Sequence, residues 1–562
     1  ITLKADKWIG AHEYGVRTVG LLDGLCGFLA ALAGAVGESR SDNFLNSVAT
    51  ATIVELVTRT LQRTNAELLS PVGVLAATRF IGSFCSVTRS LYVAHASGAR
   101  SLLQISRKIG LVNVAAGLIS PPHMDQSNMW ALITQFSGRH NATEPEGLCT
   151  HNSLVGRTVE ACAVILRCIV LVTVASGASS KEDAQAALEA MYKTHMVSRL
   201  VEACKQYGAG LSPRCVAALA GGLYELVVSS SKFATQFVDA DGLIALDELP
   251  IGLFGGDSDS DLSAVFPGGA GQQATACDVL LQSPRYDAVP ALLALGSTQH
   301  SEEEIAGMCG CAALVDMLLV ASQLARNSER YYGMLSRVFT AEKLVWILLM
   351  KNALVRSKCC NLIGNLCRHS SNFYKIISTT VLSAVSEDSP TKSTTENRQH
   401  TSHTVIELIS AYCADDDAAT RKFASFAVGN AAFHSSELYP LLADCIEPLC
   451  SALQDTDEKT RANAAGAIGN LIRNGSELCQ AMVEARVVEL LLQLLLNDAD
   501  VGPKRIALFS LGTMASHTIT RGRILSAQHP TVMEVQQALK VKHKDDEVIP
   551  KYLTRLNQKL KL

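Results

Sequence analysis

The sequence predicts an all-α protein in which helical repeats stack along a right-handed superhelix. A short helical sequence recurs several times at an interval near 40 residues, which is the length of one helical repeat. Hydrophobic residues make up 48% of the chain but aromatic residues only 5%, so Ala, Leu, Val and Ile fill the core. No segment shows the alternation of apolar and polar residues that indicates a β-strand.

The recurring sequence is a helix of small residues that ends in Gly-Asn. It reads RSKCCNLIGNL from Arg356, RKFASFAVGNA from Arg421 and RANAAGAIGNL from Arg461. The Gly and Asn follow the Arg by eight and nine residues, at Gly364-Asn365, Gly429-Asn430 and Gly469-Asn470. A fourth copy, KRIALFSLGTM, begins at Lys504 and ends in Gly512-Thr513. The copies begin 65, 40 and 43 residues apart, and a polar surface insert at 386–402, predicted to be disordered, explains the longer first interval.

The segments between the copies complete a unit of three helices. VVELLLQLLL at 487–496 supplies a long apolar helix, and SELYPLLADC at 436–445 supplies a short one. A short helix, a longer helix and a small-residue helix in this order resemble the armadillo repeat, whose third helix lines a concave groove. The predicted fold is therefore an armadillo/HEAT-like α-solenoid.

The predicted solenoid divides the chain into four parts. Residues 1–235 have helical patterns and form a degenerate helical-repeat solenoid. Residues 236–300 hold a turn followed by a Gly/Asp/Ser-rich insert, and residues 301–530 carry the armadillo repeats with the insert near 386–402. Residues 531–562 form a basic amphipathic helix. A cap on the last repeat is its favoured role, ahead of contact with an acidic surface such as a microtubule or an anionic membrane.

Composition and motifs exclude most kinds of chemistry. The chain has 49 basic and 53 acidic residues, a net charge of -4, which gives no field for nucleic-acid binding. Its 17 cysteines include no CxxC pair and indicate free thiols in a reducing, cytoplasmic compartment. The apolar run at 161–178 contains Arg167, and the part beyond it is shorter than the ~20 residues of a membrane span, so we predict a buried helix. No kinase or hydrolase motif occurs, and we expect no enzyme activity, cofactor or metal.

One stretch imitates a calcium loop without meeting its requirements. FVDADGLIALDEL at 237–249 places Asp239, Asp241 and Glu248 around a central Gly, as a calcium loop does. Phe237 stands at the first ligand position, however, where calcium needs an oxygen. We therefore interpret the stretch as a turn between two helices.

The candidate partner-binding residues are asparagines and basic residues. Stacking brings Asn365, Asn430 and Asn470 into a row, and each amide offers two donors and one acceptor. The row can hold the backbone of an extended peptide, or each amide can bond the adjacent repeat and hold the stack; the sequence leaves both open. Bonds to loop carbonyls or to a nearby Asp are the alternative for the arginines that begin the small helices. The basic candidates are Arg356, Arg421, Arg461, Lys551, Arg555 and Lys559.

Part of the sequence is similar to a known family. TRKFASFAVGNAAFHSSELYPLL at 420–442, KTRANAAGAIGNLIRNGSELC at 459–479 and KRIALFSLGTMASH at 504–517 resemble the C-terminal armadillo region of Fused-type serine/threonine kinases. Members of that family usually carry an N-terminal kinase domain, which this sequence lacks. The resemblance implies a non-catalytic scaffold that docks kinesin-like proteins or central-pair components of the ciliary axoneme. Plant cytokinesis and Hedgehog signalling are the further roles that it implies.

Two alternative functions follow from the same repeats. An importin-like cargo adaptor pairs Trp with Asn on its groove helices, but Trp8, Trp130 and Trp346 all lie outside the Gly-Asn helices. The chain can also be the regulatory portion of an active kinase whose catalytic domain lies outside it, since the sequence begins at Ile1 without Met. We expect the cytoplasm as its location, and the cilium or flagellum axoneme if the ciliary role holds.

Overall fold

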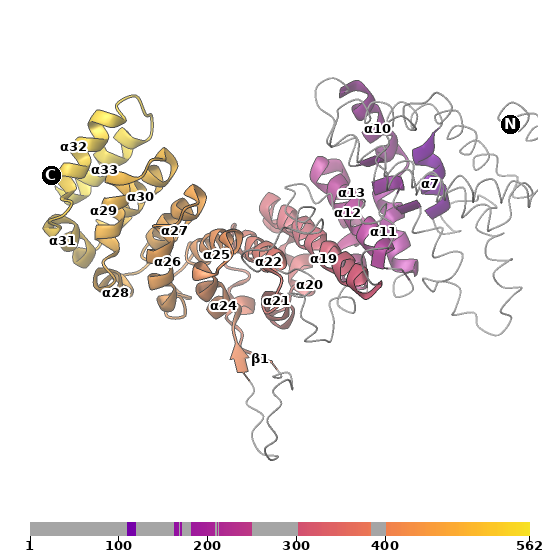
Figure 1. Cartoon of the computed structure of the whole chain (residues 1–562), viewed down its shortest axis with the longest axis horizontal. Helices are drawn as coiled ribbons and strands as arrows, with labels where there is room; N and C mark the ends of the chain where they lie inside the picture. Colours follow the sequence, from indigo (N-terminus) through magenta and orange to yellow (C-terminus); the bar gives the residue numbers. More distant parts are fainter. Residues whose placement is uncertain are drawn as a thin grey trace, which may run out of the picture. The chain divides into compact units, whose positions relative to one another are not determined.

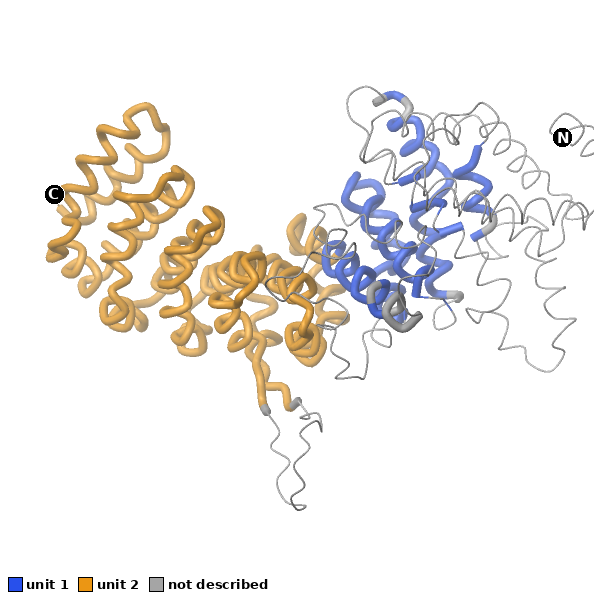
Figure 2. The backbone as a smooth tube through the Cα atoms, in the orientation of Figure 1, with its two compact units in different colours: residues 1–320 blue, residues 321–562 orange. Residues whose placement is uncertain are grey.

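The computed structural model describes two compact units, residues 1–320 and 321–562 (Figure 2). The boundary between the units falls inside helix α19 (Glu302–Asn327). The residues that the structure describes are 110–119, parts of 162–170, 181–207, 211, 213–249, 302–383 and 401–561. Most of the N-terminal helical patterns, the insert predicted after residue 250 and most of the insert at 386–402 lie outside the described residues.

Unit 1 contains a cluster of helices around an apolar core (Figure 1). Helix α11 packs against α7, α12, α13 and α14, and α12 also packs against α13. The whole middle of α12 is buried, because small residues fill its surface on every side. The helices are α7 (Leu111–Ile119), α10 (Lys181–Lys193), α11 (Met196–Tyr207), α12 (Pro213–Ser229), α13 (Ser231–Asp239) and α14 (Gly242–Asp247).

The calcium-like stretch is a tight connection between α13 and α14, as the sequence interpretation proposed. Asp241 adopts a left-handed conformation with φ of 56°. A side chain at Gly242 would collide with the ring of Phe237, which is fully buried, so this turn requires glycine. No group of three or more metal-ligating side chains occurs within the residues that the structure describes.

The described residues of the apolar run around Arg167, which lie within 162–170, are buried in unit 1. The Arg167 side chain is 2% exposed and donates from Nη1 to the carbonyl oxygen of Ala217 at 2.5 Å. Its Nη2 lies 3.4 Å from Oδ2 of Asp316, which is 1% exposed. Burial raises the pKa of Asp316 to about 6, although Arg167 opposes the rise. Because Gly221 has no side chain, the guanidinium of Arg167 can occupy the space beside it, where a Cβ would collide with it.

One described helix segment, Cys309–Asn327 of α19, is long and apolar enough to cross a membrane by length and composition alone. The fold already buries 83% of it, which is typical of the core helix of a compact domain. It also contains Asp316, the buried partner of Arg167.

Unit 2 contains five successive repeats, labelled one to five along the chain. Repeats one and two comprise η4 (Glu329–Tyr331), α20 (Tyr332–Val338), α21 (Ala341–Leu348) and α22 (Ala353–Leu366), then α23 (Tyr374–Ser378), α24 (Val405–Ala411), η5 (Tyr412–Ala414) and α25 (Ala418–Ala431). Repeats three and four comprise η6 (Ala443–Cys445), α26 (Ile446–Ala452) and α27 (Glu458–Asn470), then α28 (Cys479–Glu484), α29 (Val487–Asn497) and α30 (Val501–Met514). Repeat five comprises α31 (Thr518–Ser526), α32 (Val532–Lys542) and α33 (Ile549–Leu560).

The last helix of each repeat belongs to one continuous layer, which we call the third-helix layer. Helix α22 packs against α25, α25 against α27, α27 against α30 and α30 against α33 (Figure 1). The preceding helix of each repeat packs against its own third helix, as α21 does against α22 and α29 against α30. The core lies between these rows and is filled by residues such as Ile363, Val428 and Leu491.

Two features of unit 2 differ from the sequence prediction. A short antiparallel pair, β1 (Val381–Ser383) with β2 (Thr401–His403), stands where no strand was expected, and Leu382 pairs with Ser402. Strands of three residues are too short to show an alternating pattern. The basic segment after residue 530 is two helices rather than one, and with α31 it makes a complete fifth repeat. Thr531 and Glu534 begin α32 with a reciprocal capping box, and Asp546 binds the first backbone N–H groups of α33.

Glycine allows the third helices to approach one another closely. A Cβ at Gly429 would lie 3.3 Å from the Cα of Ala467 on the next third helix, and one at Gly469 would lie 3.1 Å from the Cα of Ser510. A Cβ at Gly364 would run into the ring of Phe426. Gly512 has the same sequence position in repeat four, but a Cβ there would meet no atom within 4 Å.

We expect opposite effects from alanine at two of these glycines. Gly469→Ala lowers the free energy of unfolding by about 1–3 kcal/mol, because the added methyl group overpacks two backbones. Gly512→Ala raises it by about 0.5–1 kcal/mol, because alanine favours the helix and finds open space. Urea unfolding of the full chain followed by circular dichroism measures both. Equal destabilisation by the two substitutions would contradict the close-approach role.

Candidate functional site: the third-helix layer

The third helices of repeats one to four each present a line of side chains spaced i, i+3, i+7 and i+10, with the last in the turn after the helix. All of them except Asn365 are half-buried or exposed, whereas the residues between them pack into the core. We call this surface the third-helix face. Its members are Lys358, Asn361, Asn365 and Arg368; Phe423, Phe426, Asn430 and Phe433; Asn463, Gly466, Asn470 and Arg473; and Ile506, Phe509, Thr513 and Ser516.

The predicted asparagines bond to the preceding repeat. Nδ2 of Asn430 donates to the carbonyl oxygen of Gly364 at 2.7 Å, and Nδ2 of Asn470 donates to that of Gly429 at 2.8 Å. Asn365 donates to the hydroxyl of Ser322 at 2.8 Å. The amide nitrogens therefore hold the stack, which is one of the two roles that the sequence left open.

The amide oxygens take no part in these inter-repeat hydrogen bonds. The Oδ1 atoms of Asn430 and Asn470 accept no hydrogen bond from a described residue, and both side chains are half-buried on the third-helix face. Oδ1 of Asn365 is buried without a partner. The acceptor sides of Asn430 and Asn470 thus remain available to a ligand.

Repeat five continues the row with a lysine. Thr513, which replaces Asn in repeat four, bonds to the Phe509 carbonyl of its own helix at 3.3 Å. Nζ of Lys559 on α33 donates to the carbonyl oxygen of Gly512 at 2.7 Å and also to the Ser516 hydroxyl. Burial, with a smaller contribution from Arg555, lowers the pKa of Lys559. The structure therefore engages Lys559 internally, although the sequence suggested it for a partner.

The predicted arginines bond across neighbouring loops. Nη2 of Arg356 lies 3.1 Å from Asp415, Nε of Arg421 lies 2.6 Å from Asp455, and Nε of Arg461 lies 2.7 Å from Asp498. In each pair the Asp belongs to the loop of the following repeat. Each Arg also donates to carbonyl oxygens in the turn before its own helix, at Met350 and Lys351, Asp415 and Asp416, and Asp455 and Thr456.

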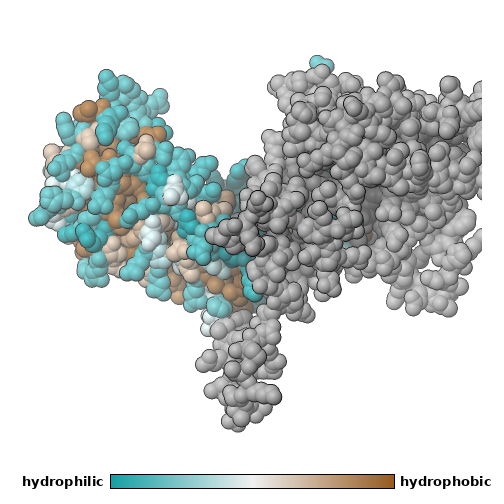
Figure 3. Space-filling view, in the orientation of Figure 1, coloured by the Kyte–Doolittle hydropathy of each residue, from teal (hydrophilic) through white to brown (hydrophobic). Residues whose placement is uncertain are grey.

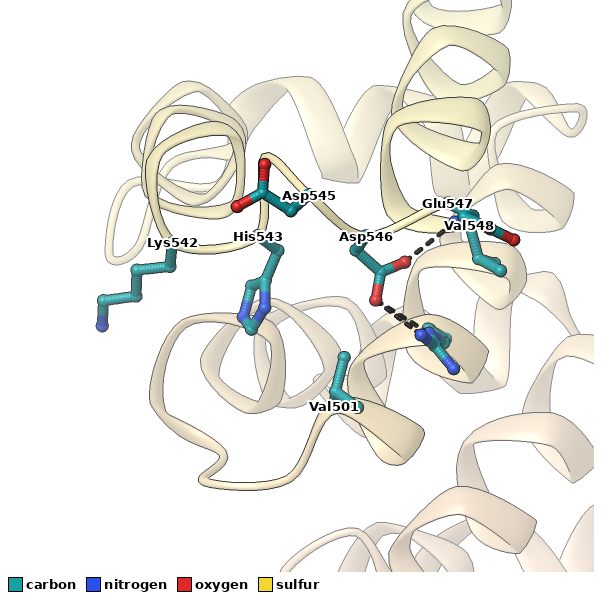
Figure 4. A pocket seen from close by; sticks show the side chains of 8 residues that line it. Val501, Lys542, His543, Asp545, Asp546, Glu547 and Val548 are labelled. Atoms are coloured by element: carbon teal, nitrogen blue, oxygen red, sulfur yellow. Dashed lines mark hydrogen bonds and ion pairs between the residues drawn. The ribbon is translucent and has the colours of Figure 1, made fainter.

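The fourth arginine in this series is Arg505. Its Nη2 lies 2.6 Å from Asp546, whereas Lys504, at the position aligned from the sequence, is buried. Asp546 accepts hydrogen bonds from Arg505 and from the backbone N–H of Val548, and it lines a pocket of about 520 Å³ together with His543 and Glu547 (Figure 4). Arg505 and Asp546 therefore form one more inter-repeat ion pair at the edge of this pocket.

The ion pairs lower the pKa values of Asp455, Asp498 and Asp546. Hydrogen bonds from Arg505 and from the Ile549 N–H lower the pKa of Asp546 to about 2. Burial alone would raise the pKa of Asp455 and Asp498, but hydrogen bonds from Arg421 and Arg461 outweigh it and the net pKa of each is lowered. These aspartates are therefore charged in the folded protein near neutral pH.

Sequence reasoning missed a row of buried tyrosines. The hydroxyls of Tyr332, Tyr374 and Tyr439 accept the backbone N–H of the residue in the turn after a third helix, which is His369, His434 or Asn474. Tyr332 and Tyr439 also donate to the carbonyl oxygens of Asn365 and Asn470. A Tyr that recurs in or just before the first helical segment of repeats one, two and three was the available signal.

No described cysteine forms a disulfide bond, and all described cysteines except Cys450 are buried. Burial raises the pKa of Cys204 and Cys413 to about 12. Cys359 and Cys360 are buried in α22, where they pack as small apolar residues. No reactive thiol occurs on the third-helix face within the described repeats.

Comparison with known proteins supports the repeat architecture. The family model of the HEAT-like repeat matches residues 418–471, from α25 to the end of α27. The crystal structure of an engineered protein matches 100% of this chain and 99% of its own, with a TM-score of 0.61 and 16% identity. The chain is an armadillo/HEAT-type α-solenoid. The predicted fold class is thereby confirmed.

Two other similar structures match less than half of this chain. A designed armadillo repeat protein matches 47% of this chain and 96% of its own at 18% identity, with a TM-score of 0.36. Another, solved in complex with the peptide (KR)4, matches 44% of this chain and 93% of its own at 19% identity, also with a TM-score of 0.36. No curated protein sequence matches the chain.

Breaking one inter-repeat ion pair is expected to destabilise the solenoid. Arg461→Met leaves Asp498, which is 3% exposed, without its main partner, and we expect a loss of about 2–4 kcal/mol in unfolding free energy. Lys459→Met on the same helix is the control, because Lys459 is exposed and forms no ion pair with a described residue. We expect the control to change stability by less than about 0.5 kcal/mol in urea unfolding. Similar losses for the two variants would contradict the structural role of Arg461.

The lowered carboxylate pKa values predict an acid transition. Because the pKa of Asp546 falls from 3.8 to about 2 on folding, its stabilisation is complete above pH 4 and disappears as pH falls through the folded value. Asp546→Asn should therefore be less stable than the native chain at pH 6, and the difference should shrink toward pH 2. Urea midpoints measured across this range test the prediction, and a difference independent of pH would contradict it.

Proposed function

We propose that the chain is a non-catalytic scaffold whose third-helix face binds an extended segment of a partner protein. The observation that carries this proposal is the orientation of the asparagine amides. Asn430 and Asn470 are each fixed by their nitrogen to the preceding repeat, while their oxygens remain without a described partner. An extended peptide has backbone N–H groups that need acceptors, so a row of fixed acceptors complements it.

The surroundings of the amides favour a peptide as the ligand. Phe426 and Phe433 stand one helical turn on either side of Asn430, on the same face and half-buried. Aromatic side chains supply contact area with little loss of side-chain entropy. Because the inter-repeat bonds fix the amides before binding, less conformational freedom is lost when the peptide docks.

The similarity to Fused-type kinases suggests which proteins use the face. We infer a kinesin-like or axonemal central-pair partner and a location in the cytoplasm and the ciliary axoneme. Support comes from the sequences at 420–442, 459–479 and 504–517, which make up helices α25, α27 and α30 of the same layer. Neither microtubule association nor attachment to a kinase domain is needed for this binding.

A matched pair of glycine substitutions tests the proposed face. Gly466 belongs to the third-helix face, and a Cβ there would meet only Ile506, at an ordinary 3.4 Å. Gly502 is exposed outside the face, and a Cβ there would meet nothing within 4 Å. Gly466→Gln therefore obstructs the face without removing a contact of the fold, and Gly502→Gln adds the same side chain elsewhere.

We expect Gly466→Gln to lose the partners that the native chain captures from a ciliated-cell extract, while Gly502→Gln retains them. Quantitative mass spectrometry of the captured proteins is the measurement. Melting temperatures should stay equal to or above the native value, because Gln favours a helix over Gly by roughly 0.5–1 kcal/mol. Retention of all partners by Gly466→Gln would show that binding lies elsewhere.

A further inference from the structure

Charge is distributed very unevenly over unit 2. The five helices of the third-helix layer contain 11 Lys and Arg residues but a single acidic residue, Glu458. The whole chain, in contrast, has a net charge of -4. The excess of positive charge is therefore a property of this layer and not of the composition.

Part of this positive charge is neutralised and part is not. Arg356, Arg421, Arg461 and Arg505 have aspartate partners. Lys422 on α25, Arg473 after α27 and Arg555 on α33 form no ion pair with a described residue. The paired aspartates lie in the loops before the third helices, and exposed Glu437 and Glu477 lie in the turns after α25 and α27, but the third-helix face itself contains cations and no carboxylate.

Several cations of this layer lie against aromatic rings. Nζ of Lys422 lies 5.3 Å from the centre of the Phe423 ring, and Nζ of Lys358 lies 5.5 Å from the same ring. The guanidinium of Arg473 lies 4.2 Å from the Phe433 ring, and that of Arg555 lies 5.1 Å from the Phe509 ring. Cation–π contacts position a cation without removing its charge.

Like charges also meet on this face. Burial first, and then repulsion from Lys422, lowers the pKa of Lys358. An anion placed between the two ammonium groups would relieve that repulsion. The third-helix face thus combines aromatic surface around Asn430 with cations at its borders, and it contains no carboxylate (Figure 3 shows hydrophobic patches among hydrophilic surface on unit 2).

We propose that the third-helix face binds an acidic extended segment that carries an apolar anchor residue. This inference rests on the proposed function and specifies the chemistry of its partner. The oxygens of Asn430 and Asn470 accept backbone N–H groups, Lys422 and Arg473 pair with carboxylates, and Phe423 and Phe426 contact the anchor. A lysine-rich segment is repelled by the same cations.

A protein segment fits this face better than a nucleic acid. The amide oxygens are hydrogen-bond acceptors, which suit backbone N–H groups and repel phosphate oxygens. Four of the arginines already bind aspartate, so few cations remain for the series of phosphate contacts on which nucleic-acid affinity depends. The net charge of -4 supplies no long-range attraction for a polyanion.

Fluorescence anisotropy with defined probes tests the inference on the full chain. The first probe is a labelled peptide of Glu and Ser residues around a central Phe-Leu pair. A second has Gln in place of every Glu, a third has Lys, and a labelled single-stranded oligonucleotide is the fourth. We expect the Glu peptide to bind at least about tenfold more tightly than the Gln peptide, and the Lys peptide not to bind. Equal affinity for the Glu and Gln peptides, or tighter binding of the oligonucleotide, overturns the inference.

Charge reversal locates the binding. The double variant Lys422→Glu/Arg473→Glu should weaken Glu-peptide binding at least about tenfold. Lys540→Glu/Lys544→Glu changes the net charge equally, on exposed residues of α32 and the turn after it, and should leave binding unchanged at constant ionic strength. An equal loss of peptide affinity in both double variants would show that only the overall charge of the chain matters, and it would overturn the inference.

Two further outcomes separate this inference from the function on which it rests. If the Glu peptide does not bind but Gly466→Gln still abolishes capture of partners, the face binds a partner of other chemistry and only the acidic inference fails. If capture is insensitive to Gly466→Gln, the proposed function fails. Light scattering tests whether a second copy of the chain occupies the face. If the native chain is a dimer and Gly466→Gln makes it a monomer, the face serves self-association and the inference of an acidic partner segment is overturned.

Discussion

The close contact between successive third helices is the interaction on which unit 2 depends. Glycine at 364, 429 and 469 brings the helix backbones together, and the next repeat's Asn then reaches the carbonyl oxygen of Gly364 or Gly429. At the other end of the same helices, an Arg binds an Asp in the loop of the following repeat. Each repeat is thus tied to its neighbour at two points along the helix, and these two ties fix the spacing of the layer.

These ties determine what remains for a partner. The amide nitrogens and four arginines are engaged within the solenoid, so they add rigidity more than affinity. The amide oxygens form no such tie, and the phenylalanines of α25 with the cations beside them form neither a hydrogen bond to a backbone carbonyl nor an ion pair between repeats; these groups lie on or beside one face. In the proposed function, stability and binding therefore use opposite ends of the same amide, and a partner would meet a surface whose geometry the fold has already fixed.

Much of the architecture was predictable because the repeats share a recognisable local sequence pattern. Gly-Asn pairs at a constant offset from Arg located α22, α25 and α27, and small residues predicted their close packing. Repeat five lacks Gly-Asn, and its Lys559 reaches the Gly512 carbonyl with a long side chain instead, so the pattern could not reveal a full repeat there. In repeat four, the inter-repeat ion pair is formed by Arg505, one residue after the position aligned from the sequence, and the aligned residue, Lys504, is buried. The pair β1–β2 was too short to have a pattern.

The sequence by itself determined the helical fold class, the repeat length and the identity of the recurring residues, because these depend on periodicity and side-chain size along the chain. The tertiary structure decided what those residues do. Asn430 lies 66 positions from its acceptor Gly364, and Arg421 lies 34 from Asp455, so each bond exists only after separate repeats stack. A basic or amide side chain has the same local pattern whether it meets an aspartate, a carbonyl oxygen or solvent, and only its three-dimensional neighbours distinguish these cases.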